Sequence, residues 1–149
     1  MTLCAPAPVA SLSPEFLAWF GDSQIVDAAG RPRVMYHGTK VPFSVFAPGT
    51  HGSCFTANLR EADRFSGLSG RLIKVYLRVA NPFVTDLAGW NRQRPSPRVV
   101  KEAGEHDGYI VRDWSGPGGD LVMVFSPAQI KSADMNCGDF DPNNPDFRA

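Results

Sequence analysis

The sequence lacks any apolar run of the ~20 residues needed to cross a bilayer, so we expect a soluble protein without a membrane partner. Its first ten residues include two prolines and no basic residue, whereas a secretory signal peptide opens with basic residues before an apolar core. We expect residues 1–13 to form a flexible leader and residues 14–149 a single domain. The protein would then be cytoplasmic, or exported as an effector by a specialised secretion route.

Cysteine and histidine are scarce, with three of each. The cysteines are far apart and form no C-x-x-C pair, and the histidines show none of the spacings typical of metal ligands. These residues are Cys4, Cys54, Cys137, His37, His51 and His106. The sequence therefore predicts free thiols in a reducing compartment and no metal site.

No charge of one sign dominates, because 15 basic residues balance 15 acidic ones. Dedicated nucleic-acid binders usually carry a basic excess, so a protein partner is favoured over a nucleic acid. What the chain does have is 14 glycines and 13 prolines, about 18% of its residues against roughly 12% on average. This surplus predicts short elements separated by many turns.

The pattern of apolar and turn residues predicts an α+β domain built from many short strands. Ser13 should cap a helix that ends at Gly21 and buries Phe16, Trp19 and Phe20. A second helix should span 58–65, opened by a capping box at Asn58, with Leu59, Ala62 and Phe65 facing inward. We expect strands or short extended pieces at 24–26, 33–37, 43–46, 54–56, 71–79, 81–84, 109–111 and 121–125, a short helix within 95–104, and an extended tail over 132–149.

His37 is the first candidate functional residue. It ends a predicted strand and precedes Gly38, so an imidazole and an accessible backbone could face one ligand; the alternative is a structural histidine before a turn glycine. Phe55 and Phe65 are most simply core residues. Asp120 lies just before an apolar run and is a candidate site residue; the alternative is that it is an ordinary polar residue at a strand boundary.

Three stretches together resemble the His-Tyr-Glu class of ADP-ribosyltransferases, especially the compact domains of phage and mobile-element polyvalent proteins. They are residues 19–39, which include WFGDS and end in HGT; residues 52–56, with Ala62 and Phe65; and residues 124–133, which include QIKS and are followed by 136–146. The resemblance spans roughly residues 16 to 146.

The resemblance implies a split β-sandwich of antiparallel strands with short helices and an NAD cleft between the two halves. In such proteins the His of HGT hydrogen-bonds a ribose hydroxyl, and the Gly after it pairs with the nicotinamide carboxamide; these positions are His37 and Gly38. Tyr36, Thr39 and Phe55 should lie beside the NAD as well.

Phe65 takes the position of the aromatic residue that stacks on nicotinamide, usually a Tyr. It keeps the stacking surface, worth about 0.5–1.5 kcal/mol beyond burial, and loses the hydroxyl. The third member is a Glu four residues before Phe125, where this chain has Leu121. Asp120 is one residue further out and could act in its place if the strand entry is bulged.

These residue types suit cleavage of the nicotinamide–ribose bond, which builds positive charge on the ribose. A carboxylate stabilises that charge, and the histidine and glycine backbone hold the dinucleotide in place. The first hypothesis is a transferase, acting as a toxin or secreted effector, that moves ADP-ribose from NAD to a macromolecular acceptor, a protein by preference. Its catalytic residues would be His37, Phe65 and Asp120. The alternatives are a degenerate NAD-binding module, because Leu121 replaces the carboxylate, and an NAD glycohydrolase with water as acceptor.

Overall fold

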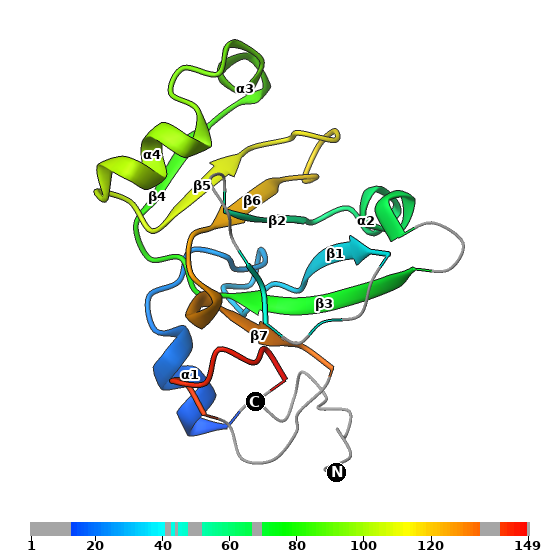
Figure 1. Ribbon diagram of the computed structural model, residues 1–149, viewed down its shortest axis with the longest axis vertical. Helices are drawn as coiled ribbons and strands as arrows, with labels where there is room; N and C mark the ends of the chain where they lie inside the picture. Colours follow the sequence, from blue (N-terminus) through cyan, green and yellow to red (C-terminus); the bar gives the residue numbers. More distant parts are fainter. Residues whose placement is uncertain are drawn as a thin grey trace.

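One mixed sheet of seven strands organises the chain (Figure 1). The computed structural model describes residues 13–40, 43, 45–47, 52–66, 70–134 and 141–148, without the side chains of residues 65 and 66. The strands lie in the order β4-β5-β6-β2-β1-β3-β7. Their bounds are β1 Met35–Thr39, β2 Ser53–Thr56, β3 Arg71–Leu77, β4 Pro82–Thr85, β5 Gly108–Val111, β6 Leu121–Val124 and β7 Ile130–Ser132. The predicted α+β class is confirmed.

The sheet divides between β1 and β2, which pair at a single position, Tyr36 opposite Thr56. On either side the pairing is longer: β1 pairs with β3 over five positions, and β2 with β6 over four. The strands β4-β5-β6-β2 therefore form one half and β1-β3-β7 the other. This division corresponds to the split that the resemblance implies, although all seven strands belong to one sheet and do not form a sandwich. We call the place where β1 and β2 part the gap between the halves.

One strand pair differs from the expected antiparallel pattern, because β4 and β5 run parallel. A parallel pair needs a crossover that returns the chain to the same end of the sheet. Here α3 (Leu87–Arg92) and α4 (Pro97–Ala103) provide it, above β4 and β5 in Figure 1. The short helix predicted within 95–104 is α4. The prediction missed α3 although Asp86 caps it, accepting from the Gly89 N–H at 2.8 Å.

The first helix, α1 (Pro14–Phe20), forms as predicted. The Ser13 side chain accepts from the Phe16 N–H at 3.1 Å, and Gly21 ends the helix at a positive φ of 50°. Phe16, Trp19 and Phe20 are each only 5% exposed. They pack with Tyr76 of β3, which attaches the helix to the half of the sheet that carries β1.

The second helix, α2, spans Leu59–Ser66. Asn58 caps it by accepting from the Arg60 N–H, but the predicted capping box does not form, because the Asn58 N–H donates to Thr56 Oγ1 instead. Ala62 is buried as predicted. Leu59 is 47% exposed, so its expected inward orientation is wrong.

The end of the described chain packs against the sheet instead of extending away from it. Residues 141–148 lie along β7, where the Ser132 N–H donates to the Phe147 carbonyl, and the Phe147 side chain is 6% exposed within the central core. The buried Lys131 ammonium donates to the carbonyls of Asp141 and Asn144 at 2.7 and 2.9 Å. The expected extended tail is thus replaced, over 141–148, by a docked segment.

Three further differences concern the strands. The piece expected at 24–26 makes one isolated bridge, Val26 to Pro32. Strand β1 begins and ends two residues later than predicted, so His37 lies in its middle and Gly38 is paired within the strand instead of starting a turn. Strand β7 was not predicted.

Within the described residues, none of the helices is long and apolar enough to span a membrane. The predicted leader falls outside the described residues except for Ser13.

Candidate active site

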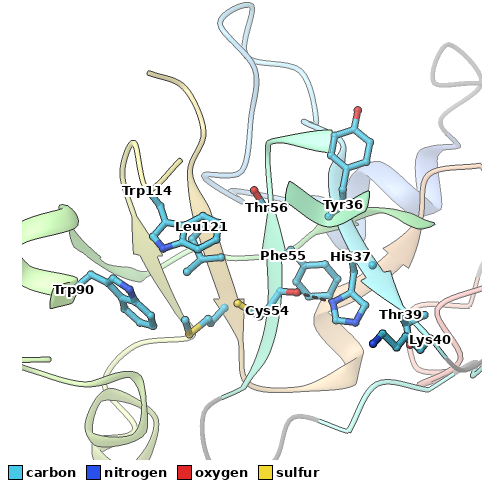
Figure 2. Close-up of a pocket in the computed structure, with 13 residues that line it drawn as sticks. Tyr36, His37, Thr39, Lys40, Cys54, Phe55, Thr56, Trp90, Trp114 and Leu121 are labelled. Carbon is cyan, nitrogen blue, oxygen red and sulfur yellow. Dashed lines mark hydrogen bonds between the residues drawn. The ribbon is translucent and has the colours of Figure 1, made fainter. Parts of the chain in front are cut away.

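A cavity of about 480 Å³ lies where β1 and β2 part (Figure 2). Both halves of the sheet line it, and α2, α3 and the turn between β5 and β6 complete its wall. The lining residues are Tyr36, His37, Gly38, Thr39, Lys40, Cys54, Phe55, Thr56, Ala62, Trp90, Trp114, Leu121 and Met123. All five NAD-binding candidates from β1 and β2 (Tyr36 to Thr39, and Phe55) therefore meet at one cavity.

His37 is fixed in this cavity by one hydrogen bond and by aromatic packing. Its Nδ1 lies 2.7 Å from the carbonyl oxygen of Cys54, drawn as a dashed line in Figure 2. Its ring centroid lies 5.1 Å from that of Phe46 and 5.4 Å from that of Phe55. The ring is therefore held across the gap between the two halves of the sheet.

The Cys54 contact also determines which nitrogen of His37 is free. A carbonyl oxygen only accepts hydrogen bonds, so Nδ1 carries the proton and, in the neutral ring, Nε2 is an acceptor. Burial lowers the pKa of His37 below its usual 6.5, although the Cys54 carbonyl opposes part of this shift. The ring is therefore neutral at pH 7, and Nε2 can accept a hydrogen bond from a hydroxyl group.

The other walls of the cavity are mostly apolar. Phe55 is 1% exposed and Ala62 is equally buried. Part of Cys54 is exposed, but packing around its thiol raises the pKa to about 11, so the thiol stays protonated. Across the described chain, no group of three or more His, Cys, Asp or Glu side chains is arranged to hold a metal ion.

Comparison with known families matches this chain over residues 27–108 to a model described as ADP-ribosyltransferase in polyvalent proteins. The match covers more than half of the chain and includes β1, β2 and α2 with their cavity residues. The chain belongs to this family of ADP-ribosyltransferases. No curated protein and no solved structure matches it.

Members of this ADP-ribosyltransferase family use NAD as their substrate. Two predicted site residues, Phe65 and Asp120, are not among the described residues that line the cavity. Phe65 lies on α2, the helix that contributes Ala62 to the cavity wall, but its side chain is outside the described residues. Its stacking role stays a prediction.

Asp120 is the predicted residue that the structure does not bring to the cavity. It is 5% exposed and lies beside Arg33 and Arg112, with nitrogen–oxygen distances of 3.3 and 3.0 Å to its Oδ2. Its Oδ1 accepts from the Asp113 N–H at 2.9 Å. Side chains alternate along a strand, so Asp120 faces the side of the sheet opposite to the next residue, Leu121.

Leu121 does line the ADP-ribosyltransferase cavity. The position where the resemblance places a catalytic Glu is thus at the expected wall, occupied by an apolar side chain. None of the lining residues, all within the described chain, is acidic. Leu121 and Asp120 also lie outside the matched stretch of 27–108.

Eight of the thirteen lining residues were not among the predicted site residues, and Lys40, Trp90 and Trp114 are the most informative of them. Lys40 directly follows the HGT motif, so its position next to the site could have been anticipated. Trp90 and Trp114 are on α3 and on the β5–β6 turn. Only the fold brings these segments to the cavity, since no local motif marks either tryptophan.

Proposed function

We propose that this chain binds NAD in the cavity and transfers its ADP-ribose to a protein acceptor with release of nicotinamide. The observation that carries the proposal is His37, whose ring is held neutral across the gap with Nε2 free to accept a hydrogen bond. The family match supports the same activity.

Each cavity group has a part in holding the substrate. A ribose hydroxyl donates to Nε2 of His37, and the backbone of Gly38, the next residue on β1, lies beside the nicotinamide carboxamide. Phe55 and, from α2, Phe65 supply apolar surface for the ring. Among the lining residues that the structure describes, Lys40 is the one with an ammonium group, and it is the partner for the diphosphate.

Breaking the nicotinamide–ribose bond develops positive charge on the ribose, and the fixed dinucleotide exposes that carbon to an acceptor. A reaction that used the Asp120 carboxylate would first require the β5–β6 turn to rearrange, because two arginines and a backbone N–H occupy its oxygens. We therefore infer that the described site contributes by positioning NAD. Stabilisation of the ribose charge by Asp120 is not part of this proposal.

Leu121 favours a second candidate, an NAD-binding module without transfer. Its apolar side chain lines the cavity where a carboxylate would stabilise the developing charge. Such a module would bind NAD through the same residues of β1 and leave it intact.

One set of measurements separates the candidates. The chain is incubated with labelled NAD and candidate protein acceptors, while calorimetry measures NAD binding by the wild type and by His37→Ala. Transfer requires label on an acceptor and slower labelling by His37→Ala at NAD concentrations below saturation; equal labelling by both proteins would refute the proposal. NAD binding without nicotinamide release supports the module, and release without label identifies water as acceptor.

The Leu121→Glu variant sharpens this comparison. Placing a carboxylate in the cavity wall should raise nicotinamide release above the wild-type rate if the missing charge limits the reaction. Leu121→Gln, of similar size and uncharged, is the matched control. The role as a toxin or secreted effector remains a prediction from the resemblance.

A further inference from the structure

The cavity has an end away from His37 that is aromatic and apolar. Trp90 comes from α3 and Trp114 from the turn between β5 and β6, and both line the cavity together with Leu121 and Met123 of β6. We call these four residues the tryptophan end. Figure 2 shows the two indole rings on the opposite side of the cavity from Thr39.

The charge of NAD fits the other end. Lys40 lies beside Thr39 in Figure 2, and it carries the one ammonium group in the described part of the lining. The negative charge of NAD is on its diphosphate, and the proposed pairing with Lys40 puts the diphosphate on the Lys40 side of His37. An acceptor has to approach the ribose from the side that the diphosphate leaves open, and that side is the tryptophan end.

The indole N–H groups define what this end can bind. Trp19, in the core, donates its Nε1–H to the Ala128 carbonyl at 2.9 Å, whereas neither Trp90 nor Trp114 has such a partner among the described residues. An indole N–H only donates, so it pairs with an oxygen and not with the donor-only side chains of arginine or lysine. A hydroxyl group supplies that oxygen without bringing a charge into an apolar wall.

The two rings are held in place before any acceptor arrives. Trp90 packs edge-on against Tyr109 of β5, with ring centroids 6.1 Å apart. The turn that carries Trp114 is fastened on both sides of that residue: the Asp113 N–H donates to Asp120, and Ser115 Oγ accepts from the side chain of Asn58 at 3.3 Å. A fixed wall favours binding because less motion is lost when the partner docks.

We propose that the tryptophan end is the acceptor subsite and that it admits the hydroxyl of a serine, threonine or tyrosine of a protein. This inference rests on the proposed function and names its acceptor chemistry. In the step, the ribose–nicotinamide bond breaks and nicotinamide leaves with the electron pair. The acceptor oxygen bonds to the same ribose carbon and releases its proton to water. A nucleic-acid hydroxyl would bring phosphates to an end whose lining has no cation.

The test uses three tryptophan-free peptides that are identical except for a central Ser, Arg or Glu. Their binding to the full chain is followed by the protein's tryptophan fluorescence with NAD present, and their labelling by mass spectrometry. The Ser peptide should bind about tenfold more tightly than the Arg peptide, and any label should be on Ser. Trp90→Phe and Trp114→Phe keep an aromatic, though smaller, ring and remove the N–H, so they should reduce this preference.

Val99→Ala is the control, because Val99 is 54% exposed on α4 and does not line the cavity. A preference for the Arg or Glu peptide, or an unchanged preference in both Phe variants, would overturn the subsite. So would label on an RNA oligonucleotide instead of a peptide in a parallel incubation that contains both. Calorimetry with NAD alone distinguishes a failure of the acceptor subsite from a failure of the proposed function. Normal NAD binding with equal peptide binding refutes only the subsite, whereas no NAD binding refutes the proposed function on which it rests.

Discussion

Replacing Asp120 by asparagine should cost stability and leave NAD binding intact. The Asp120 side chain is 8% exposed, and its two partners, Arg33 and Arg112, are 29% and 47% exposed. A hydrogen bond to a charged group contributes about 1.5–3 kcal/mol, and the exposure of both arginines screens part of it. Asparagine can still accept from the Asp113 N–H. We therefore expect a loss of about 2 kcal/mol, or a fall in Tm of about 4–8 °C for a chain of this size.

Urea and thermal unfolding measure this loss, and calorimetry measures the affinity for NAD. Glu102→Gln is the matched control, because the Arg98–Glu102 pair is more than 60% exposed on both sides and should contribute under about 1 kcal/mol. The opposite pattern would refute the reasoning. If Asp120→Asn unfolds like the control but abolishes nicotinamide release at unchanged NAD affinity, the carboxylate acts in catalysis and its ion pairs are incidental.

Three substitutions and one change of pH test the structure further. His37→Ala should weaken NAD binding about fivefold to tenfold in calorimetry, because one hydrogen bond is lost. In the wild type, NAD affinity should be constant above about pH 6.5 and fall at lower pH, since protonation of Nε2 removes the acceptor. The free energy of unfolding should also fall at lower pH, because the pKa of His37 is lower in the folded chain and the unfolded chain therefore binds the proton more tightly. Lys131→Met should cost about 2 kcal/mol in urea unfolding and expose residues 141–148 to limited proteolysis, because two carbonyls lose their charged donor. Trp19→Ala should cost about 3–5 kcal/mol in the same assay, and a loss below 1 kcal/mol would contradict its place in the core.

Local signals in the sequence predicted the elements whose causes are local. The cap at Ser13, the proline after it and the apolar spacing that follows give α1 and its buried face without reference to the rest of the chain. The strand that ends in HGT also follows from local pattern. Helix α3 was missed because a glycine in its middle weakens the helical signal, and it forms where the crossover between two parallel strands requires it.

The site residues also divide into those that local motifs predict and those that only the fold places. Motifs along the chain named His37, Gly38 and Phe55, and the fold brings all three to one cavity. In the sequence, Leu121 stands at the expected carboxylate position, and Asp120, one residue before it, could act there only if the strand entry is bulged. The pleat of β6 turns them to opposite faces, so one residue lines the cavity and the other joins an ion-pair cluster.

The sequence by itself determined the family, the α+β class and His37 as a site candidate on a strand. Those features depend on residue type and on spacing within a short stretch. Tertiary structure alone decided which face of β6 meets the cavity, which nitrogen of His37 is free, and that Trp90 and Trp114 lie across from it. Each of these depends on contacts between segments far apart in the chain, such as the carbonyl of Cys54 against the ring of His37, and no local pattern encodes them.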